Sequence, residues 1–171
     1  MVGLILTEDL KWRRNTEYIC QKARQKLWML RRMLSLDLDI YQMYDVYTKE
    51  VRSMVELAVP VWHPGLTKNQ SDDIERIQKV SFKIILQNQY STYQQACIIF
   101  SAQTLHLRRE KLCLNFARKN LKSDQTLFTK LNTNTRSTDV VREYNSNHGR
   151  FQKTSLPYMA KLLNNDAMKR K

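Results

Sequence analysis

The sequence predicts an all-α fold, and the prediction depends on its few turn-forming residues and its helical spacing of apolar residues. Only three Gly and three Pro occur among the 171 residues, whereas a β-sandwich or barrel needs many turns built from such residues. A chain of this length is the size of one domain. We therefore expect a helical bundle with a short N-terminal strand remnant and a poorly ordered C-terminal tail.

The first third of the chain predicts one strand and two helices. Met1–Leu6 is a short apolar run that predicts a strand, followed by a turn at Thr7–Asp9. Helices are expected over about 15–34 and from Asp37 or Asp39, either of which can cap the helix, to Pro60. The expected buried residues are Ile19, Ala23, Leu27, Leu30 and Leu34 in the first helix, and Ile40, Met43, Tyr44, Tyr47, Val51, Met54 and Ala58 in the second.

A rigid, proline-rich turn is expected over 60–66, with Trp62 as its packing anchor. Thr67 and Gln70 have the spacing of a capping box, although Ser71 could also start this helix. Further helices are expected over 92–100 and 104–121. The expected buried residues are Ile74, Ile77, Ser81, Ile84 and Ile85, then Leu105, Leu112, Cys113 and Phe116.

The last part of the chain is more polar. Residues 132–138 are too polar to fold alone and predict a linker, and a weak helix returns at 156–163 before the basic end 169–171.

Positive charge is the main functional signal. Lys and Arg outnumber Asp and Glu by 29 to 16, which gives a formal charge of +13 and favours a polyanionic partner such as nucleic acid. Between Lys11 and Leu34 there are eight basic residues and only one acidic residue, Glu17. The alternative is a merely solvated helix face. The candidate phosphate contacts are Arg13, Arg14, Lys22, Arg24, Arg31 and Arg32, and with less support Arg108, Arg109, Lys111, Arg118 and Lys119.

No catalytic centre or cofactor site is expected. Asp72 and Asp73 are adjacent carboxylates, but a helix start explains them better than a metal site, because acidic groups favour a first helical turn. The histidines His63, His106 and His148 have no further ligand residues at the sequence spacings that metal sites require, such as His-x-Asp, His-Glu-x-x-His or Cys-x-x-Cys. Cys20, Cys97 and Cys113 predict reduced thiols rather than disulfides. Trp12, Trp28 and Trp62 favour packing over base stacking, least so for Trp28.

No apolar run approaches the ~20 residues that cross a bilayer. We therefore expect no membrane partner and an intracellular protein of the nucleus or cytoplasm.

Several segments together resemble the polymerases of non-LTR retrotransposons. They are Val2–Trp12, Gln21–Leu27 with Leu30–Arg32, Val55–Pro64, Ile74–Lys79 and Leu105–Cys113, with a weaker echo at Ser155–Tyr158 and Leu162–Asn164. Each segment alone is unspecific, and their order and spacing carry the resemblance. The matching region of these polymerases comprises the end of the palm, the thumb and the connection, and the segments resemble that region. The family members are reverse transcriptases, the RNA-directed DNA polymerases of transposable elements.

The resemblance implies a domain organisation and a partner. Residues 1–10 would be a remnant of a palm strand and turn, 11–122 a helical thumb and connection, and 123–171 a polar linker and basic tail with a weak helix. The helices would contact an RNA–DNA hybrid, or RNA, through phosphates without reading sequence. The family's Tyr-x-Asp-Asp hairpin is absent, so no catalysis is implied, and the missing palm and fingers would be further partners.

Two other interpretations stay open. The chain could be a stand-alone basic adaptor that binds RNA or an acidic protein, since residues 2–60 are also similar to an N-terminal segment assigned to AlkB-like tRNA-modifying proteins. It could also be a decayed open reading frame without a selected role.

Overall fold

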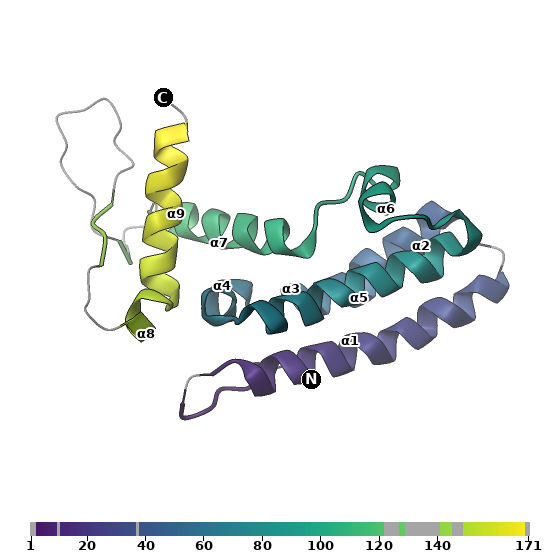
Figure 1. Ribbon diagram of the computed structural model, residues 1–171, viewed down its shortest axis with the longest axis horizontal. Helices are drawn as coiled ribbons and strands as arrows, with labels where there is room; N and C mark the ends of the chain where they lie inside the picture. Colours follow the sequence, from purple (N-terminus) through teal and green to yellow (C-terminus); the bar gives the residue numbers. More distant parts are fainter. Residues whose placement is uncertain are drawn as a thin grey trace. The chain divides into compact units, whose positions relative to one another are not determined.

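The computed structural model describes residues 3–9, 11–36, 38–121, 127–128, 141–144 and 149–169. Every regular element within these ranges is a helix (Figure 1), which confirms the predicted all-α class. The predicted linker at 132–138 and the last two residues lie outside the described residues. The chain divides into two compact units. Unit 1 comprises Met1–Ala58 and Leu66–Arg108, and unit 2 comprises Val59–Gly65 and Arg109–Lys171. The domain boundaries drawn from the resemblance stay a prediction.

The predicted N-terminal strand is not formed by the described residues 3–9. A single strand has no ladder to join, and the backbone N–H of Ile5 instead donates to Oδ1 of Asn15 at 3.1 Å. The predicted turn is present, because Asp9 accepts from the Thr7 hydroxyl at 2.6 Å and from the Lys11 N–H at 3.1 Å. These hydrogen bonds, that of Thr7 first, lower the pKa of Asp9 to about 2.

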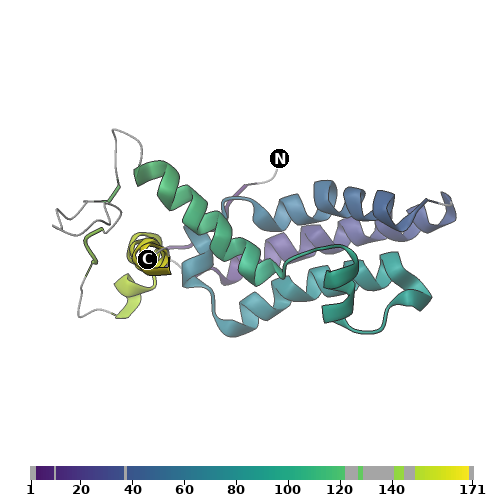
Figure 2. The ribbon, with the colours of Figure 1, turned by 90° about the horizontal axis from the view of Figure 1, so that it is seen from above.

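The first long helix, α1, spans Arg13–Met33, and a short 3-10 turn, Leu34–Leu36, follows. Its apolar stripe is buried as predicted, except that Leu34 is half-buried. Figures 1 and 2 show α1 alongside α5 and the α2–α3 segment, all within unit 1. The buried residues of α1 are Asn15, Thr16, Ile19, Cys20, Ala23, Leu27 and Leu30.

The second predicted helix is present but contains a π-helical turn. It consists of α2 (Ile40–Val46), the π turn Tyr47–Arg52 and α3 (Ser53–Glu56). Asp39 forms a capping box with Gln42, which decides between the two predicted caps. Met43, Tyr47 and Val51 are buried as predicted, and Val55 is buried in place of Met54. Within these elements, the residues predicted to be buried that are only half-buried are Ile40, Tyr44 and Met54. The buried residues follow one another at intervals of four. Four residues exceed one full turn of a regular α-helix by about 40°, and the π turn, with more residues per turn, reduces this excess and keeps them on one face.

The prediction that Pro60 ends this helix is wrong. The helix ends at Glu56, because Leu57 is extended and Ala58 has a φ of 51°. Pro60 instead lies in the first turn of a new helix, α4 (Val59–Trp62), where its missing N–H costs nothing. Ala58 is consequently only half-buried.

The next three helices agree closely with prediction. α5 spans Lys68–Leu86 and begins with a complete Thr67–Gln70 capping box, so Ser71 does not start it. α6 (Tyr93–Ile99) has Thr92 as its N-cap, and α7 spans Leu105–Leu121. The prediction that Phe116 is buried is wrong, because its side chain is 40% exposed, and Ile84 and Leu112 are only half-buried. Ala117 takes the inward position next to Phe116.

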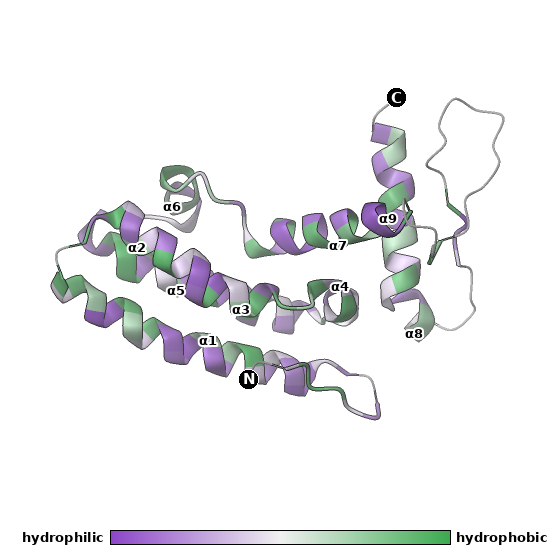
Figure 3. Ribbon diagram, turned by 180° about the vertical axis from the view of Figure 1, so that it is seen from behind, coloured by the Kyte–Doolittle hydropathy of each residue, from purple (hydrophilic) through white to green (hydrophobic). Residues whose placement is uncertain are grey.

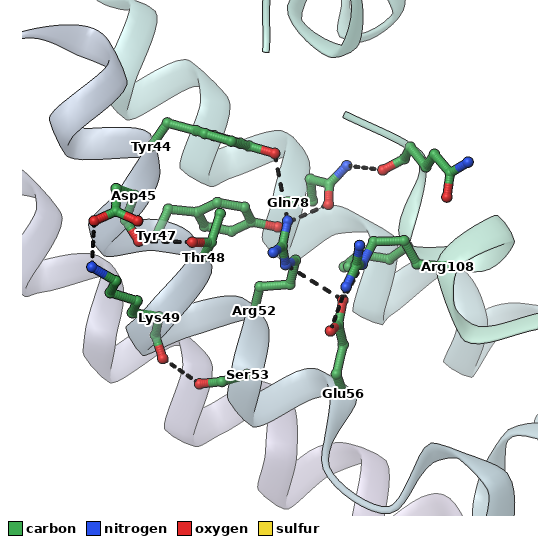
Figure 4. A network of polar contacts seen from close by, with 12 residues as sticks. Tyr44, Asp45, Tyr47, Thr48, Lys49, Arg52, Ser53, Glu56, Gln78 and Arg108 are labelled. Atoms are coloured by element: carbon green, nitrogen blue, oxygen red, sulfur yellow. Dashed lines mark hydrogen bonds and ion pairs between the residues drawn. The ribbon is translucent and has the colours of Figure 1, made fainter. Parts of the chain in front are cut away.

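The core of unit 1 combines stacked aromatic rings with a buried polar network. Tyr44 stacks on Phe100 with ring centroids 4.5 Å apart, and Phe82 packs against both. The Tyr47 hydroxyl donates to Oε1 of Gln78 at 2.8 Å (Figure 4), and Gln78 Nε2 donates to the hydroxyl of Tyr93 at 2.9 Å. Every one of these residues lies in α2, the π turn, α5, α6 or the turn after α6, so the network holds these elements together.

Unit 2 is built around α4, the later part of α7, α8 (Gly149–Gln152) and α9 (Ser155–Lys169). α9 is longer than the weak helix predicted at 156–163. Its inward residues Met159, Ala160, Leu163 and Ala167 are buried. Asn164 also fixes Val141, with hydrogen bonds to its backbone N–H at 2.9 Å and carbonyl at 3.1 Å. Trp62 is fully buried, as its predicted role as a packing anchor requires.

Candidate nucleic-acid interface

The candidate interface lies on the outward face of α1. Trp12 precedes the helix and is buried, and its carbonyl accepts from both the N–H and the hydroxyl of Thr16 at 2.8 Å. This start fixes which face of α1 packs inward. Five of the six predicted basic residues are then exposed, and Lys22 is half-buried: Arg13, Arg14, Arg24, Arg31 and Arg32 are the exposed ones.

Helix geometry arranges these arginines in two rows. At about 100° per residue, Arg13, Arg24 and Arg31 fall within about 20° of one line along α1, and Arg14 and Arg32 fall on a second line about 100° away. Each row spans roughly 27 Å at a rise of 1.5 Å per residue. Figure 3 shows hydrophilic and hydrophobic residues alternating along α1.

Acidic partners are present at one end of this face and at its edge. Glu17 accepts from Nε of Arg13 at 2.9 Å, which raises the pKa of that guanidinium. Lys26 pairs with Glu50 at 2.9 Å. No acidic residue occurs in the sequence between Glu17 and Asp37. The part of α1 that carries Arg24, Arg31 and Arg32 therefore has positive charge that no acidic residue of α1 offsets.

Trp28 lies between the two arginine rows. Its side chain is 64% exposed, whereas Trp12 is 9% and Trp62 is 0% exposed. The guanidinium carbon of Arg32 lies 5.9 Å from the centroid of the Trp28 ring, within the range of a cation–π contact. The packing interpretation is thus confirmed for Trp12 and Trp62, and Trp28 is a surface residue.

Three of the basic residues predicted on α7 have partners within their own units. Arg108 forms a bidentate ion pair with Glu56 (Figure 4), and the Nη2–Oε2 distance is 2.9 Å. Arg118 pairs with Asp166 at 2.6 Å.

Arg109 is the one that departs most from expectation. It is 0% exposed, and its Nε donates to Nδ1 of His63 at 3.3 Å. It therefore has no exposed surface with which to contact a phosphate in this structure. Lys111 and Lys119 are exposed, as expected of phosphate contacts.

α5 carries further exposed basic residues that are not among the predicted phosphate contacts. Arg76, Lys79 and Lys83 recur at steps of three and four residues on the side of α5 away from Ile74 and Ile77. The ammonium of Lys79 lies 5.2 Å from the ring centroid of Tyr93, and that of Lys83 lies 5.4 Å from that of Tyr90. The spacing alone could have revealed this face, but the neighbouring tyrosines come from a later segment.

Asp72 and Asp73 both lie within α5. α5 begins at Lys68, so both lie in its second turn rather than its first as expected, and Asp73 pairs with Arg76 at 3.3 Å. Among the described residues, no three His, Cys, Asp or Glu side chains are grouped so that they could hold a metal ion. His63 is buried and His106 is exposed, while His148 lies outside the described residues.

No helix in the described part of the chain is both long enough and apolar enough to cross a membrane. Comparisons of the chain with models of known families, with curated proteins and with solved structures return no match.

Proposed function

We propose that this chain binds the phosphate backbone of an RNA–DNA hybrid through the outward face of α1, without reading sequence. The observation that carries the proposal is the exposure of five arginines on one face of a single rigid helix. The sequence resemblance supports the same role, that of the thumb and connection of a non-LTR retrotransposon reverse transcriptase. An intracellular location, in the nucleus or cytoplasm, is part of this proposal.

Arginine rows suit a phosphate backbone for physical reasons. Each guanidinium can donate two parallel hydrogen bonds to phosphate oxygens, and each neutralised phosphate releases condensed counterions, which favours binding. Such contacts position the protein but carry no base information. Binding should therefore depend on charge and on backbone shape and vary little with base sequence.

The arginines of α7 contribute differently in this account. Because Arg108 and Arg118 already pair with Glu56 and Asp166, and Arg109 is buried, we assign these three to the stability of the fold. Lys111 and Lys119 stay as peripheral contacts. The proposal thus depends on Arg13, Arg14, Arg24, Arg31 and Arg32, with Lys22 beside them.

The direct test is binding of a labelled RNA–DNA hybrid, followed by fluorescence anisotropy. Changing Arg24, Arg31 and Arg32 together to Gln removes three positive charges from α1 and keeps helix propensity. A charge-matched control changes Lys153, Lys161 and Lys169 to Gln, three exposed residues of unit 2. We expect the α1 variant to lose affinity for hybrids of unrelated sequence alike and the control to lose much less. Equal losses would mean that only total charge matters.

A further inference from the structure

Trp28 is the least buried of the three tryptophans and the only one on the basic face of α1. Leu27 beside it is 3% exposed and Leu30 is 0% exposed, so the helix has a well-packed inner side that Trp28 does not join. An indole left in water gives up one of the largest apolar burials that any side chain can make. Single exposed apolar side chains are common on protein surfaces, so the charged residues around Trp28 indicate its partner.

The surroundings of Trp28 indicate what it binds. Helix spacing places Arg24 one turn before it and Arg31 and Arg32 one turn after it, and no acidic residue of α1 lies near. This positive environment favours an anionic partner over a cationic or neutral one. A flat aromatic ring flanked by arginines offers a stacking surface for a base and hydrogen-bond donors for the phosphates on either side.

We propose that Trp28 stacks on an unpaired base of a single-stranded nucleic acid, while Arg24, Arg31 and Arg32 hold the flanking phosphates. This inference rests on the proposed function and extends it from the hybrid to single-stranded nucleic acid bound by the same helix, α1. Paired regions present phosphates only, because their base faces are covered by neighbouring pairs. Apart from the two terminal pairs of a duplex, only an unpaired base can offer its face to the indole, so Trp28 should distinguish single strands from duplexes.

The test compares oligo(U) with a blunt RNA–DNA hybrid, using the full chain. Trp28→Ala should weaken oligo(U) binding about tenfold, as loss of one stacked base does, and Trp28→Phe, which keeps a ring, should recover most of that loss. Binding of the hybrid should change by about twofold or less. The matched control is Tyr41→Ala, an aromatic side chain that is 59% exposed on α2 and has Asp39 and Asp45 rather than arginines nearby in sequence. It should leave oligo(U) binding unchanged.

Tryptophan fluorescence gives an independent readout. Binding of unlabelled oligo(U) should quench the emission of the wild type, and this quenching should disappear in Trp28→Phe, because Trp12 and Trp62 are buried. Urea unfolding of each variant should match that of the wild type, since Trp28 is exposed. An oligo(U) affinity that is unchanged in Trp28→Ala, or reduced as much in Tyr41→Ala, would overturn the inference.

Two further outcomes separate this inference from its alternatives. If Trp28 instead joins two copies of the chain, sedimentation velocity should detect a dimer that Trp28→Ala dissociates, and base stacking would be wrong. If changing Arg24, Arg31 and Arg32 to Gln leaves hybrid binding unchanged, but Trp28→Ala still weakens oligo(U) binding, the hybrid proposal fails and the stacking inference stands. If the arginine variant weakens hybrid binding, but Trp28→Ala leaves oligo(U) binding unchanged, only the stacking inference is overturned.

Discussion

Glu56, at the end of α3, and Arg108, in the first turn of α7, form a bidentate ion pair in unit 1. Arg52 approaches the same carboxylate, with Nε 3.5 Å from Oε1 (Figure 4). The side chains of Glu56, Arg52 and Arg108 are only 15%, 21% and 30% exposed. The hydrogen bond with Glu56 raises the pKa of Arg108. One carboxylate therefore balances the charge of two guanidinium groups.

Glu56→Gln should therefore lower the free energy of unfolding by about 2 kcal/mol, because it leaves two partly buried arginines without their counter-charge. Urea unfolding measures this change. The matched control is Asp73→Asn, which breaks a pair with Arg76 whose side chains are 46% and 66% exposed, and we expect a loss of about 0.5 kcal/mol or less. Similar losses in both variants would show that the Glu56 cluster is no stronger than a surface pair.

Tyr47→Phe tests the polar network at the π turn. Tyr47 is 1% exposed, and removing its hydroxyl leaves Oε1 of the buried Gln78 without its donor. We expect the free energy of unfolding to fall by about 1.5 kcal/mol. Tyr41→Phe removes the same hydroxyl group from a residue that is 59% exposed and should change stability little. An undiminished stability in Tyr47→Phe would mean that water replaces the lost donor.

Local features of the fold could be predicted from sequence, and long-range pairings could not. The Asp39 and Thr67 caps are among the predicted alternatives, because a cap and its partner lie within three residues of each other. Glu56 and Arg108 lie 52 residues apart, so no spacing rule joins them. The break at Ala58 has no sequence signal, because alanine does not favour a positive φ, and a proline such as Pro60 is compatible with a helix end or a helix start.

Thr67→Ala should cost about 1 kcal/mol of stability, since it removes the side-chain oxygen that accepts from the Gln70 N–H. Thermal or urea unfolding followed by circular dichroism measures the loss. Asn69→Ala, an exposed position two residues later, makes no cap and should leave stability equal or slightly higher. A loss at Asn69 that equals the loss at Thr67 would contradict the assigned start of α5.

Stability should fall as the pH rises above about 9 because of Cys113. Burial is the main cause that raises the pKa of this thiol from 9.0 to about 12. The unfolded chain therefore loses the thiol proton near pH 9 while the folded chain keeps it, so rising pH favours unfolding between about pH 9 and 12. Stability at neutral pH is unaffected by this group.

Cys113→Ala isolates this effect. It should lower stability at neutral pH through the lost side-chain volume, and its urea midpoint should fall less steeply than that of the wild type between pH 8.5 and 10. Cys97, whose pKa is also raised by burial, contributes equally to both proteins and cancels in the comparison. If the urea midpoints of the two proteins fall in parallel as the pH rises, the Cys113 thiol titrates alike in the folded and unfolded states.

The candidate interface was predictable only in part. The spacing of α1 was enough to place its arginines outward, because the apolar stripe at 19, 23, 27 and 30 is regular. On α7, two adjacent arginines compete for one inward position, and only the fold shows that Arg109 takes it, beside His63 at 46 residues' separation. The same stripe makes packing least favoured for Trp28, and the structure shows Trp28 64% exposed beside the buried Leu27 and Leu30.

The salt dependence of hybrid binding tests the central claim most directly. If Arg24, Arg31 and Arg32 contact phosphates, the logarithm of the association constant should fall linearly with the logarithm of salt concentration, with a slope of roughly one unit per neutralised phosphate. Changing all three to Gln should then reduce the slope by about three units, or less where a contact is partial. The unit 2 control variant should keep nearly the wild-type slope. A slope that is the same for the wild type and the α1 variant would show that this face of α1 is a solvated surface, and it would contradict the proposed function.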